Sequence, residues 1–163
     1  MKKLKYVIQF HIATRTHYDF RLEWNGVMLS WAIPKGPSLN PSDKRLAIQV
    51  EDHPISYNDF EGVIPKGQYG AGPVMIWDEG HWEQTVDANL ALAGKDTLKF
   101  ELFGKRLKGK WNLVKTKKYQ TKNSDNQWLL IKEKDEYSQE NSGIEEFVTS
   151  IRTGRTIEKI ISS

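Results

Sequence analysis

The sequence of 163 residues contains no cysteine. This absence excludes a disulfide framework, a thiolate metal cluster and a cysteine nucleophile, and it is compatible with a reducing cytoplasm. No apolar run approaches the roughly 18 residues of a transmembrane helix, and the N-terminal MKKLKYVIQF lacks the apolar stretch of a signal peptide. We therefore expect a cytoplasmic protein without a membrane partner.

Charge is unevenly distributed along the chain, although the formal net charge is only +3. The block Gly104–Lys122 carries eight basic residues and no acidic one, with Trp111 and Tyr119 among them. Basic side chains beside aromatic rings suit a phosphate backbone and unstacked bases, whereas a solvated strand face is the alternative interpretation. With 38% hydrophobic and 28% charged residues, the chain can bury a core and is not expected to be disordered.

Short stretches typical of β-strands dominate the sequence. From His17 to Glu23 polar and apolar residues alternate strictly, which predicts a half-buried strand with one chemically rich face. Further β-prone runs cover residues 6–10, 27–33, 46–51, 74–77, 97–103, 111–116 and 128–132. Turns rich in glycine and proline separate these runs, a pattern typical of a barrel or a sandwich.

Helical signals are few. Leu90–Ala93 is a candidate for one helical turn. Between Ile144 and Ile161 the apolar residues are spaced loosely as on a helix, with an interruption at Gly154. We expect this terminal helix to pack on the rest of the chain through Ile151, Ile157 and Ile160.

Two of only four histidines form an H-x5-H-x-D pattern, made by His11, His17 and Asp19. On a strand, His17 and Asp19 point to the same face and lie close enough to share an ion. His11 precedes a turn near residues 13–14, so it can fold back as a third ligand. Two imidazoles and one carboxylate leave coordination positions open, which favours a catalytic divalent metal over a closed structural site. Ordinary polar-face histidines and an Fe(II) oxygenase site are the alternatives.

Candidate phosphate-binding groups lie close to this pattern. Arg21 continues the strand face beyond Asp19, and bidentate arginine contacts suit phosphate oxygens. Arg45 adds a second cation, His53 can bind phosphate as imidazolium or protonate a leaving oxygen, and Tyr57 can hydrogen-bond to the same group. An ordinary turn histidine and a core aromatic ring are the alternatives for the last two.

Three other features require an interpretation. Lys35 lies between Pro34 and Gly36 on a stiff loop, where it can contact phosphate or simply be solvated. The segment Gly67–Gly72 resembles a phosphate-binding loop only superficially, because it lacks the strand-to-helix context and the Lys-Ser/Thr pair, and we interpret it as a tight structural turn. His81 has no carboxylate at ligand spacing and is expected on the surface.

Several long motifs together carry a family resemblance. They are H-x-A-T-R-x-H-Y-D-F-R-L-E at 11–23, S-W-A-I-P-K-G-P-S at 30–38, R-L-A-I-Q-V-E-D-H-P at 45–54 and D-F-E-G-V-I-P-K-G-Q-Y-G-A-G at 59–72. They continue with F-G-K-R-L-K-G-K-W at 103–111 and W-L-L-I-K at 128–132. Over almost all of its length before the tail, the chain closely resembles the 3′-phosphoesterase domain of bacterial ATP-dependent DNA ligase D and its stand-alone relatives.

This resemblance implies a mainly β fold, a compact closed β-barrel over residues 1–142 with short helical segments. The apolar spacing adds a helical tail over residues 143–163, which we expect to belong to the same domain. The resemblance also implies a Mn²⁺-dependent hydrolase, with Co²⁺ or Zn²⁺ as other candidate metals. Such an enzyme removes a terminal ribonucleoside and then the remaining 3′-phosphate from a primer strand. The implied metal ligands are His11, His17 and Asp19. The implied catalytic and phosphate-binding residues are Arg21, Lys35, Arg45, Glu51, His53 and Tyr57, with Arg15 as a further substrate contact.

Lys35 and Arg45 match positions tied to the phosphomonoesterase step, and the departures from the family pattern are Ile12 in place of an acidic residue and Lys66 where glutamate is common. We expect a monomer that acts on the 3′ ends of DNA or DNA/RNA primer-templates. Because no polymerase or ligase sequence is attached, an end-joining role would require a separate ligase, polymerase or Ku protein. The rival hypotheses are a catalytically silent nucleic-acid-binding barrel that uses the basic block, and the Fe(II) oxygenase.

Overall fold

The computed structural model describes residues 3–85, 97–116 and 126–163. In these ranges the elements are β1 (Leu4–Ile12), β2 (Thr16–Trp24), β3 (Val27–Ile33), β4 (Arg45–His53), the 3₁₀ helix η1 (Ile55–Asp59), β5 (Gly62–Ile64), β6 (Gly72–Gln84), β7 (Thr97–Gly104), β8 (Lys108–Lys115), β9 (Gln127–Lys132) and α2 (Ile157–Ser162). Every run that we expected to form a strand coincides with one of these strands, except that the run 111–116 extends one residue beyond β8. The candidate turn Leu90–Ala93 lies outside the described residues.

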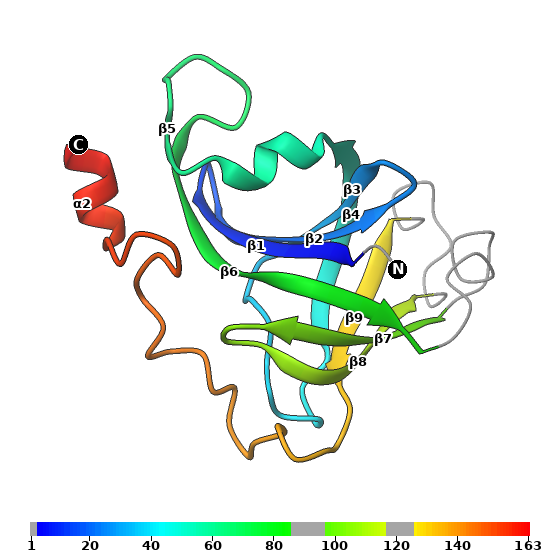
Figure 1. Ribbon diagram of the computed structural model, residues 1–163. Helices are drawn as coiled ribbons and strands as arrows, with labels where there is room; N and C mark the ends of the chain where they lie inside the picture. The colour runs from blue at the N-terminus through cyan, green and yellow to red at the C-terminus, as the bar shows by residue number, and fades with distance from the viewer. Residues whose placement is uncertain (1–2, 86–96, 117–125) are drawn as a thin grey trace.

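Eight of the strands form a closed antiparallel barrel (Figure 1). Their order is β1-β2-β3-β4-β9-β8-β7-β6, and pairing of β6 with β1 closes the ring. The long strand β6 pairs with β1 along one edge and with β5 and β7 along the other. The predicted closed β-barrel is therefore confirmed, and β5 is an addition to its rim.

The hairpin between β2 and β3 follows directly from its turn residues. Asn25 and Gly26 have positive φ angles of 49° and 83°, and they connect the paired residues Trp24 and Val27. A two-residue turn with both φ angles positive matches the right-handed twist of the flanking strands. This turn sets the register that brings the functional face of β2 beside β3.

Alternation along the strands separates an inner from an outer face. Tyr6 and Ile8 of β1 and Phe20 and Leu22 of β2 belong to the buried core inside the barrel. That core also contains four fully buried tryptophans, Trp31, Trp77, Trp82 and Trp111. The residues between the core positions point to the outer face, where η1, β5 and the following loop form a second layer across β1 and β2 (Figure 1). The functional side chains lie between this layer and the barrel.

The C-terminal tail differs from the expected long helix. Only Ile157–Ser162 is helical, with Thr156 as its N-cap. Before it, the chain turns through Gly154, which has a φ of 74°, and Thr149 and Thr156 form an isolated β-bridge. A positive φ and a bridge between nearby residues are incompatible with a continuous helix. The expected C-terminal helix and the interruption at Gly154 are therefore confirmed, whereas the expectation of helix before Gly154 is wrong.

The tail nevertheless packs on the barrel. Ile160 is buried in the main core and Ile157 packs against it, while Ile151 contacts a smaller cluster on the outer face. The backbone N–H of Ile151 donates a hydrogen bond of 2.9 Å to the carbonyl of Ile76 on β6. Within the described part of the chain, no helix has the length and apolar character needed to cross a membrane.

The basic block is only partly described, because Tyr119 and three of its lysines lie outside the described residues. Trp111 is fully buried, and its indole N–H donates to the Lys108 carbonyl. The expectation that this ring stacks on bases is therefore wrong, since its position on β8 points it into the barrel. The guanidinium of Arg106 also has partners within the protein, because it donates hydrogen bonds to the carbonyl of Trp77 and to the Thr149 hydroxyl.

Candidate active site

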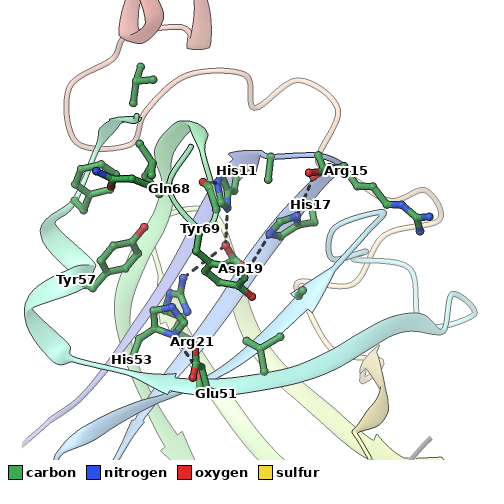
Figure 2. Close-up of a pocket in the computed structure, with 18 of the residues that line it drawn as sticks. His11, Arg15, His17, Asp19, Arg21, Glu51, His53, Tyr57, Gln68 and Tyr69 are labelled. Atoms are coloured by element: carbon green, nitrogen blue, oxygen red, sulfur yellow. Dashed lines mark hydrogen bonds and ion pairs between the residues drawn. The ribbon is translucent and has the colours of Figure 1, made fainter. Parts of the chain in front are cut away.

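A cavity of about 790 Å³ opens between the outer face of the barrel and the layer formed by η1, β5 and the following loop. Figure 2 shows side chains from separate strands converging there. The lining includes eight of the ten site residues expected from the sequence: His11, Arg15, His17, Asp19, Arg21, Glu51, His53 and Tyr57. The structure thus brings together residues that are up to 46 positions apart in the chain.

The three expected metal ligands form one compact group. His11 and His17 lie directly opposite each other in the ladder between β1 and β2. His11 Nδ1 is 3.5 Å from Oδ2 of Asp19, and His17 Nε2 is 3.2 Å from Oδ1. One potential ligand atom from each residue lies within 4.8 Å of the others. Two imidazoles and one carboxylate in this arrangement can bind a divalent metal ion.

Backbone carbonyls orient both imidazole rings. His11 Nε2 is 2.7 Å from the carbonyl oxygen of Gly70, and His17 Nδ1 is 3.1 Å from that of Arg15. A carbonyl can only accept a hydrogen bond, so in the neutral rings these nitrogens carry the protons. The lone pairs therefore lie on His11 Nδ1 and His17 Nε2, the nitrogens that face Asp19. This is the outer-shell arrangement that fixes the tautomer of metal-binding histidines.

The electrostatics of the group also suit a cation. Burial tends to raise the pKa of Asp19, but the hydrogen bonds that the imidazole rings of His11 and His17 donate when they carry a second proton, together with the charge of Arg21, outweigh it and hold this pKa well below its ordinary value. The hydrogen bond to Asp19 in turn raises the pKa of His17 above its ordinary value. Asp19 is therefore an ionised ligand throughout the neutral pH range. The charge and donor chemistry of the group fit a divalent metal.

Arg21 is a fixed cation beside the metal group. It is buried, and its Nη2 lies 3.6 Å from Oδ2 of Asp19. Its Nε donates to Gln9 Oε1 and its Nη1 donates to the Ser30 hydroxyl, both at 2.8 Å. These three partners on β1, β2 and β3 leave the guanidinium little freedom to change its position. Such a group is preorganised to bind a phosphoryl oxygen.

His53 and Tyr57 lie on the opposite side of Arg21 from the histidine pair. His53 Nδ1 donates to the carbonyl of Glu51 at 3.0 Å, so Nε2 is the nitrogen available to a ligand. Burial and the nearby charge of Arg21 lower the pKa of His53. The Tyr57 ring lies 5.4 Å from the His53 ring and 5.3 Å from the Arg21 guanidinium carbon. Burial raises the pKa of Tyr57, which keeps its hydroxyl protonated and able to donate.

The remaining expected residues have different positions. Glu51 and Arg15 are exposed and line the edge of the cavity. Lys35 and Arg45, although both described, are not among its lining residues. Lys35 is exposed on its loop, and Arg45 Nη2 lies 3.8 Å from Oδ2 of Asp43. The individual roles of all ten residues stay predictions.

Sequence reasoning missed the residues that support Arg21. Gln9 is fully buried, and while Oε1 accepts from Arg21, Nε2 donates to the carbonyls of Tyr57 and Phe60 at 2.8 and 3.2 Å. It therefore connects the cation to the chain segment that carries Tyr57. The available signal was its spacing, because Gln9 lies two residues before His11 and shares its face of β1.

The segment Gly67–Gly72 has a second role that its interpretation as a tight turn did not include. Its backbone does turn, with hydrogen bonds from Gln68 to Pro65 and from Ala71 to Gln68. However, Gln68, Tyr69 and Gly70 also line the cavity. His81 is half-exposed and stacks on Phe103, outside the cavity.

Comparisons with known proteins are consistent with this site. The family model for the DNA ligase D 3′-phosphoesterase domain matches residues 9–115. The multifunctional non-homologous end joining protein LigD of Pseudomonas aeruginosa is 52% identical over 132 residues, which cover 81% of this chain and 15% of that protein. The LigD proteins of Mycobacterium tuberculosis and Mycolicibacterium smegmatis are each 39% identical, covering 97% and 95% of this chain.

The matched region is only a small part of each relative. This chain spans about one-fifth or less of the length of these curated proteins. The family model in contrast covers well over half of the chain described here, including every expected site residue. The chain therefore belongs to the DNA ligase D 3′-phosphoesterase domain family.

Proposed function

We propose that this protein is a Mn²⁺-dependent hydrolase that removes a 3′-phosphate and a 3′-terminal ribonucleoside from a primer strand during DNA end joining. The observation that carries the proposal is the group of His11, His17 and Asp19 next to the buried guanidinium of Arg21. A metal ligand set with open positions beside a fixed cation suits the hydrolysis of a phosphate ester. The relatives are named as proteins of non-homologous end joining.

His11, His17 and Asp19 would hold the ion, which when bound supplies Lewis-acid polarisation of a phosphoryl oxygen. Arg21 would bind a second phosphoryl oxygen and neutralise the charge that develops there. His53 can accept or return a proton at Nε2, because its Nδ1 proton is committed to the Glu51 carbonyl. Tyr57 can donate its hydroxyl proton to the same phosphate.

The residues at the edge of the cavity and outside it would contact the strand beyond the reacting phosphate. Arg15 and Glu51 lie at the edge of the cavity, and Lys35 and Arg45 lie outside it. We propose that the protein acts as a monomer in the cytoplasm on DNA or DNA/RNA primer-templates, together with a separate ligase, polymerase or Ku protein. The negative charge of such a substrate suits the cations in and around the cavity.

The test uses a labelled primer-template that ends either in a 3′-phosphate or in a short ribonucleotide tract. Wild type, His17→Ala and the matched control His81→Ala are incubated with Mn²⁺, Co²⁺, Zn²⁺ or EDTA. We expect metal-dependent conversion to a 3′-hydroxyl by wild type and His81→Ala. For His17→Ala we expect the rate of conversion to fall at least about 100-fold, because the substitution removes one of only three metal ligands.

Three outcomes would overturn the proposal. Full turnover by a correctly folded His17→Ala variant would exclude the metal assignment. DNA binding without any processing would favour the silent nucleic-acid-binding barrel. Oxygen consumption that depends on Fe(II), without ester hydrolysis, would favour the oxygenase.

A further inference from the structure

The cavity has an apolar wall that the proposed phosphoryl chemistry does not use. Its floor, on β1, β2 and β4, carries the buried charged groups and the histidines described above, and Tyr57 of η1 lies beside His53. The opposite side is formed by Phe60, Val63, Ile64 and Pro65, together with Tyr69. A phosphate needs only the floor. The volume of about 790 Å³ is instead in the range of pockets that hold a whole small molecule, roughly 300–1,000 Å³.

Tyr69 is the most unusual residue of this wall. Its side chain is 95% exposed, the largest value among the exposed large hydrophobic residues of the described chain. In Figure 2 it lies in front of Asp19, on the loop that lines the cavity. The next residue, Gly70, accepts the hydrogen bond from His11. The backbone beside Tyr69 is therefore held close to the metal group, while the ring itself is open to a ligand.

We propose that Tyr69 and the apolar wall form a stacking subsite for a nucleobase, namely the base of the nucleoside whose 3′ oxygen carries the phosphate. This inference rests on the proposed function. That nucleoside is common to both proposed substrates, whereas the leaving ribonucleoside is present in only one. Its phosphate would meet Arg21 and the metal group on the floor, and its planar base would meet the wall.

The chemistry of the two sides fits such a ligand. A nucleotide combines an anionic group with a flat aromatic surface, and the cavity combines cations with apolar and aromatic side chains. Stacking on an aromatic side chain tolerates any base, because every base presents a π-face. The subsite would therefore bind strand ends without selecting their sequence.

The experiment compares two 3′-phosphate primers that differ only at the terminal nucleoside, one with 2-aminopurine and one abasic. Wild type, Tyr69→Ala and Tyr69→Phe are measured with Mn²⁺, and Tyr137→Ala is the matched control, because Tyr137 is an exposed tyrosine outside the cavity. We expect Tyr69→Ala to raise KM for the 2-aminopurine primer about tenfold. The KM values of Tyr69→Phe and Tyr137→Ala should stay within about twofold of wild type, because both variants keep an aromatic ring at position 69.

The abasic primer separates stacking from a structural role of Tyr69. For wild type, KM should be about tenfold higher for the abasic primer than for the 2-aminopurine primer. On the abasic primer, Tyr69→Ala should not raise KM any further. The 2-aminopurine fluorescence should be quenched on binding to wild type but not to Tyr69→Ala. Equal KM values for wild type and Tyr69→Ala, or an equal loss on both primers, would overturn the subsite. Metal-dependent conversion of the abasic primer by wild type would still support the proposed function, whereas no conversion of either primer would overturn that function itself.

Discussion

The floor and the wall of the cavity are built in different ways. The floor lies on continuous barrel strands, and His11, Asp19 and Arg21 are all buried there with directed hydrogen bonds or ion pairs. The wall lies on the residue that caps a short 3₁₀ helix, on a three-residue strand and on the loop that follows it. Groups that stabilise a transition state gain from being fixed before the substrate arrives, whereas a surface that stacks on any base does not need the same precision.

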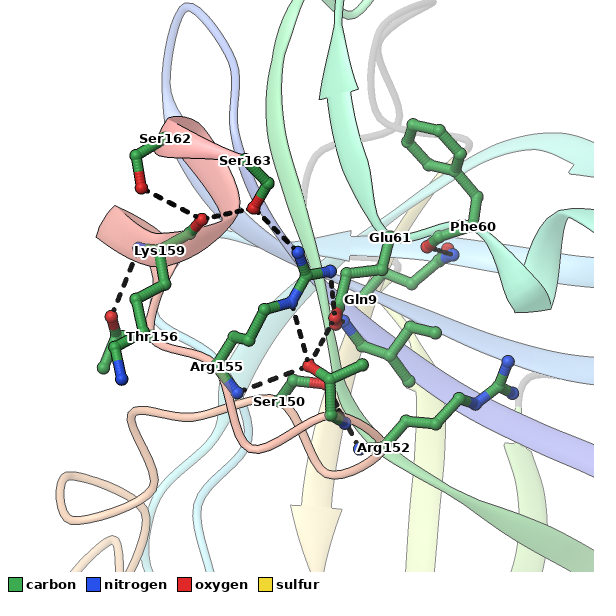
Figure 3. Close-up of polar contacts among 12 residues, drawn as sticks. Gln9, Phe60, Glu61, Ser150, Arg152, Arg155, Thr156, Lys159, Ser162 and Ser163 are labelled. Carbon is green, nitrogen blue, oxygen red and sulfur yellow. Dashed lines mark hydrogen bonds and ion pairs between the residues drawn. The ribbon is translucent and has the colours of Figure 1, made fainter.

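The wall is held from outside by the C-terminal tail (Figure 3). Glu61, just before β5, accepts hydrogen bonds from the backbone N–H of Ile76, from the Thr153 hydroxyl and from Arg155, at 2.8, 2.7 and 3.0 Å. Nearby, Arg152 pairs with Asp59 and Glu79 at 3.0 and 2.6 Å. The tail thus connects the layer above the cavity to β6 of the barrel. We therefore expect substitutions in the floor to change the rate of the chemical step. Substitutions in the tail should instead change substrate binding and the stability of the protein.

The largest effect is expected from Arg21→Gln. This substitution removes the buried cation of the floor, and the loss of one such electrostatic group typically costs about 10²–10³ in kcat. Steady-state hydrolysis of the 3′-phosphate primer measures it, with circular dichroism to check folding. Arg152→Gln removes an equal charge from the tail and should stay within about threefold of wild-type kcat. A folded Arg21→Gln variant with wild-type kcat would contradict the role assigned to the floor.

A smaller effect is expected from Glu61→Ala, which breaks the connection between wall and tail. The substitution leaves the Ile76 N–H without its side-chain acceptor, and an unsatisfied buried group costs about 1–3 kcal/mol. We expect Tm to fall by several degrees, at about 2–4 °C per kcal/mol for a protein of this size. KM should rise while kcat changes little, because the floor stays intact.

Thermal unfolding and steady-state kinetics of Glu61→Ala and Glu61→Gln provide the measurement. Glu83→Ala is the matched control, because Glu83 is an exposed glutamate on β6. Glu61→Gln should be intermediate, since an amide oxygen can still accept from Ile76. If Glu61→Ala lowered kcat as strongly as Arg21→Gln, the separation between wall and floor would be wrong.

The floor could be predicted from the sequence because its information is local. Strict alternation around His17, Asp19 and Arg21 places them on one face of a strand, and this face needs no knowledge of the remaining fold. The third ligand, His11, requires only the adjacent hairpin, whose register brings it opposite His17. The residue types and their alternation along the strand were sufficient to predict these positions.

The wall and its supports could not be predicted in the same way. Glu61, Thr153 and Arg155 are brought together over more than 90 positions of sequence, and no periodicity encodes that contact. The tail was expected to be helical on both sides of an interruption at Gly154, because its apolar spacing does not reveal that the segment before Gly154 turns back and bridges to Thr156. Trp111 was considered as a ring that could stack on bases, because the inward face of β8 is defined only when the barrel closes. Tertiary pairing, and not local preference, decides each of these cases.

The smallest and most local effect concerns the histidines of the floor in metal-free protein. The hydrogen bond to Asp19 raises the pKa of His17 above 6.5, whereas burial and Arg21 lower that of His53 below 6.5. The contribution of His17 to stability is therefore complete below pH 6.5 and is lost as pH rises through its folded pKa. The contribution of His53 has the opposite sign and is lost as pH falls below 6.5.

Titration of the imidazole resonances by NMR measures both values in one experiment, with His→Gln variants for assignment and His81 as a control outside the cavity. In Asp19→Asn the pKa of His17 should fall, because the carboxylate that stabilises its protonated form is gone. In Arg21→Gln the pKa of His53 should rise, because a neighbouring positive charge is removed. A His17 pKa that does not respond to Asp19→Asn would mean that the carboxylate and the imidazole are not coupled, and the floor would then lack the fixed geometry that distinguishes it from the wall.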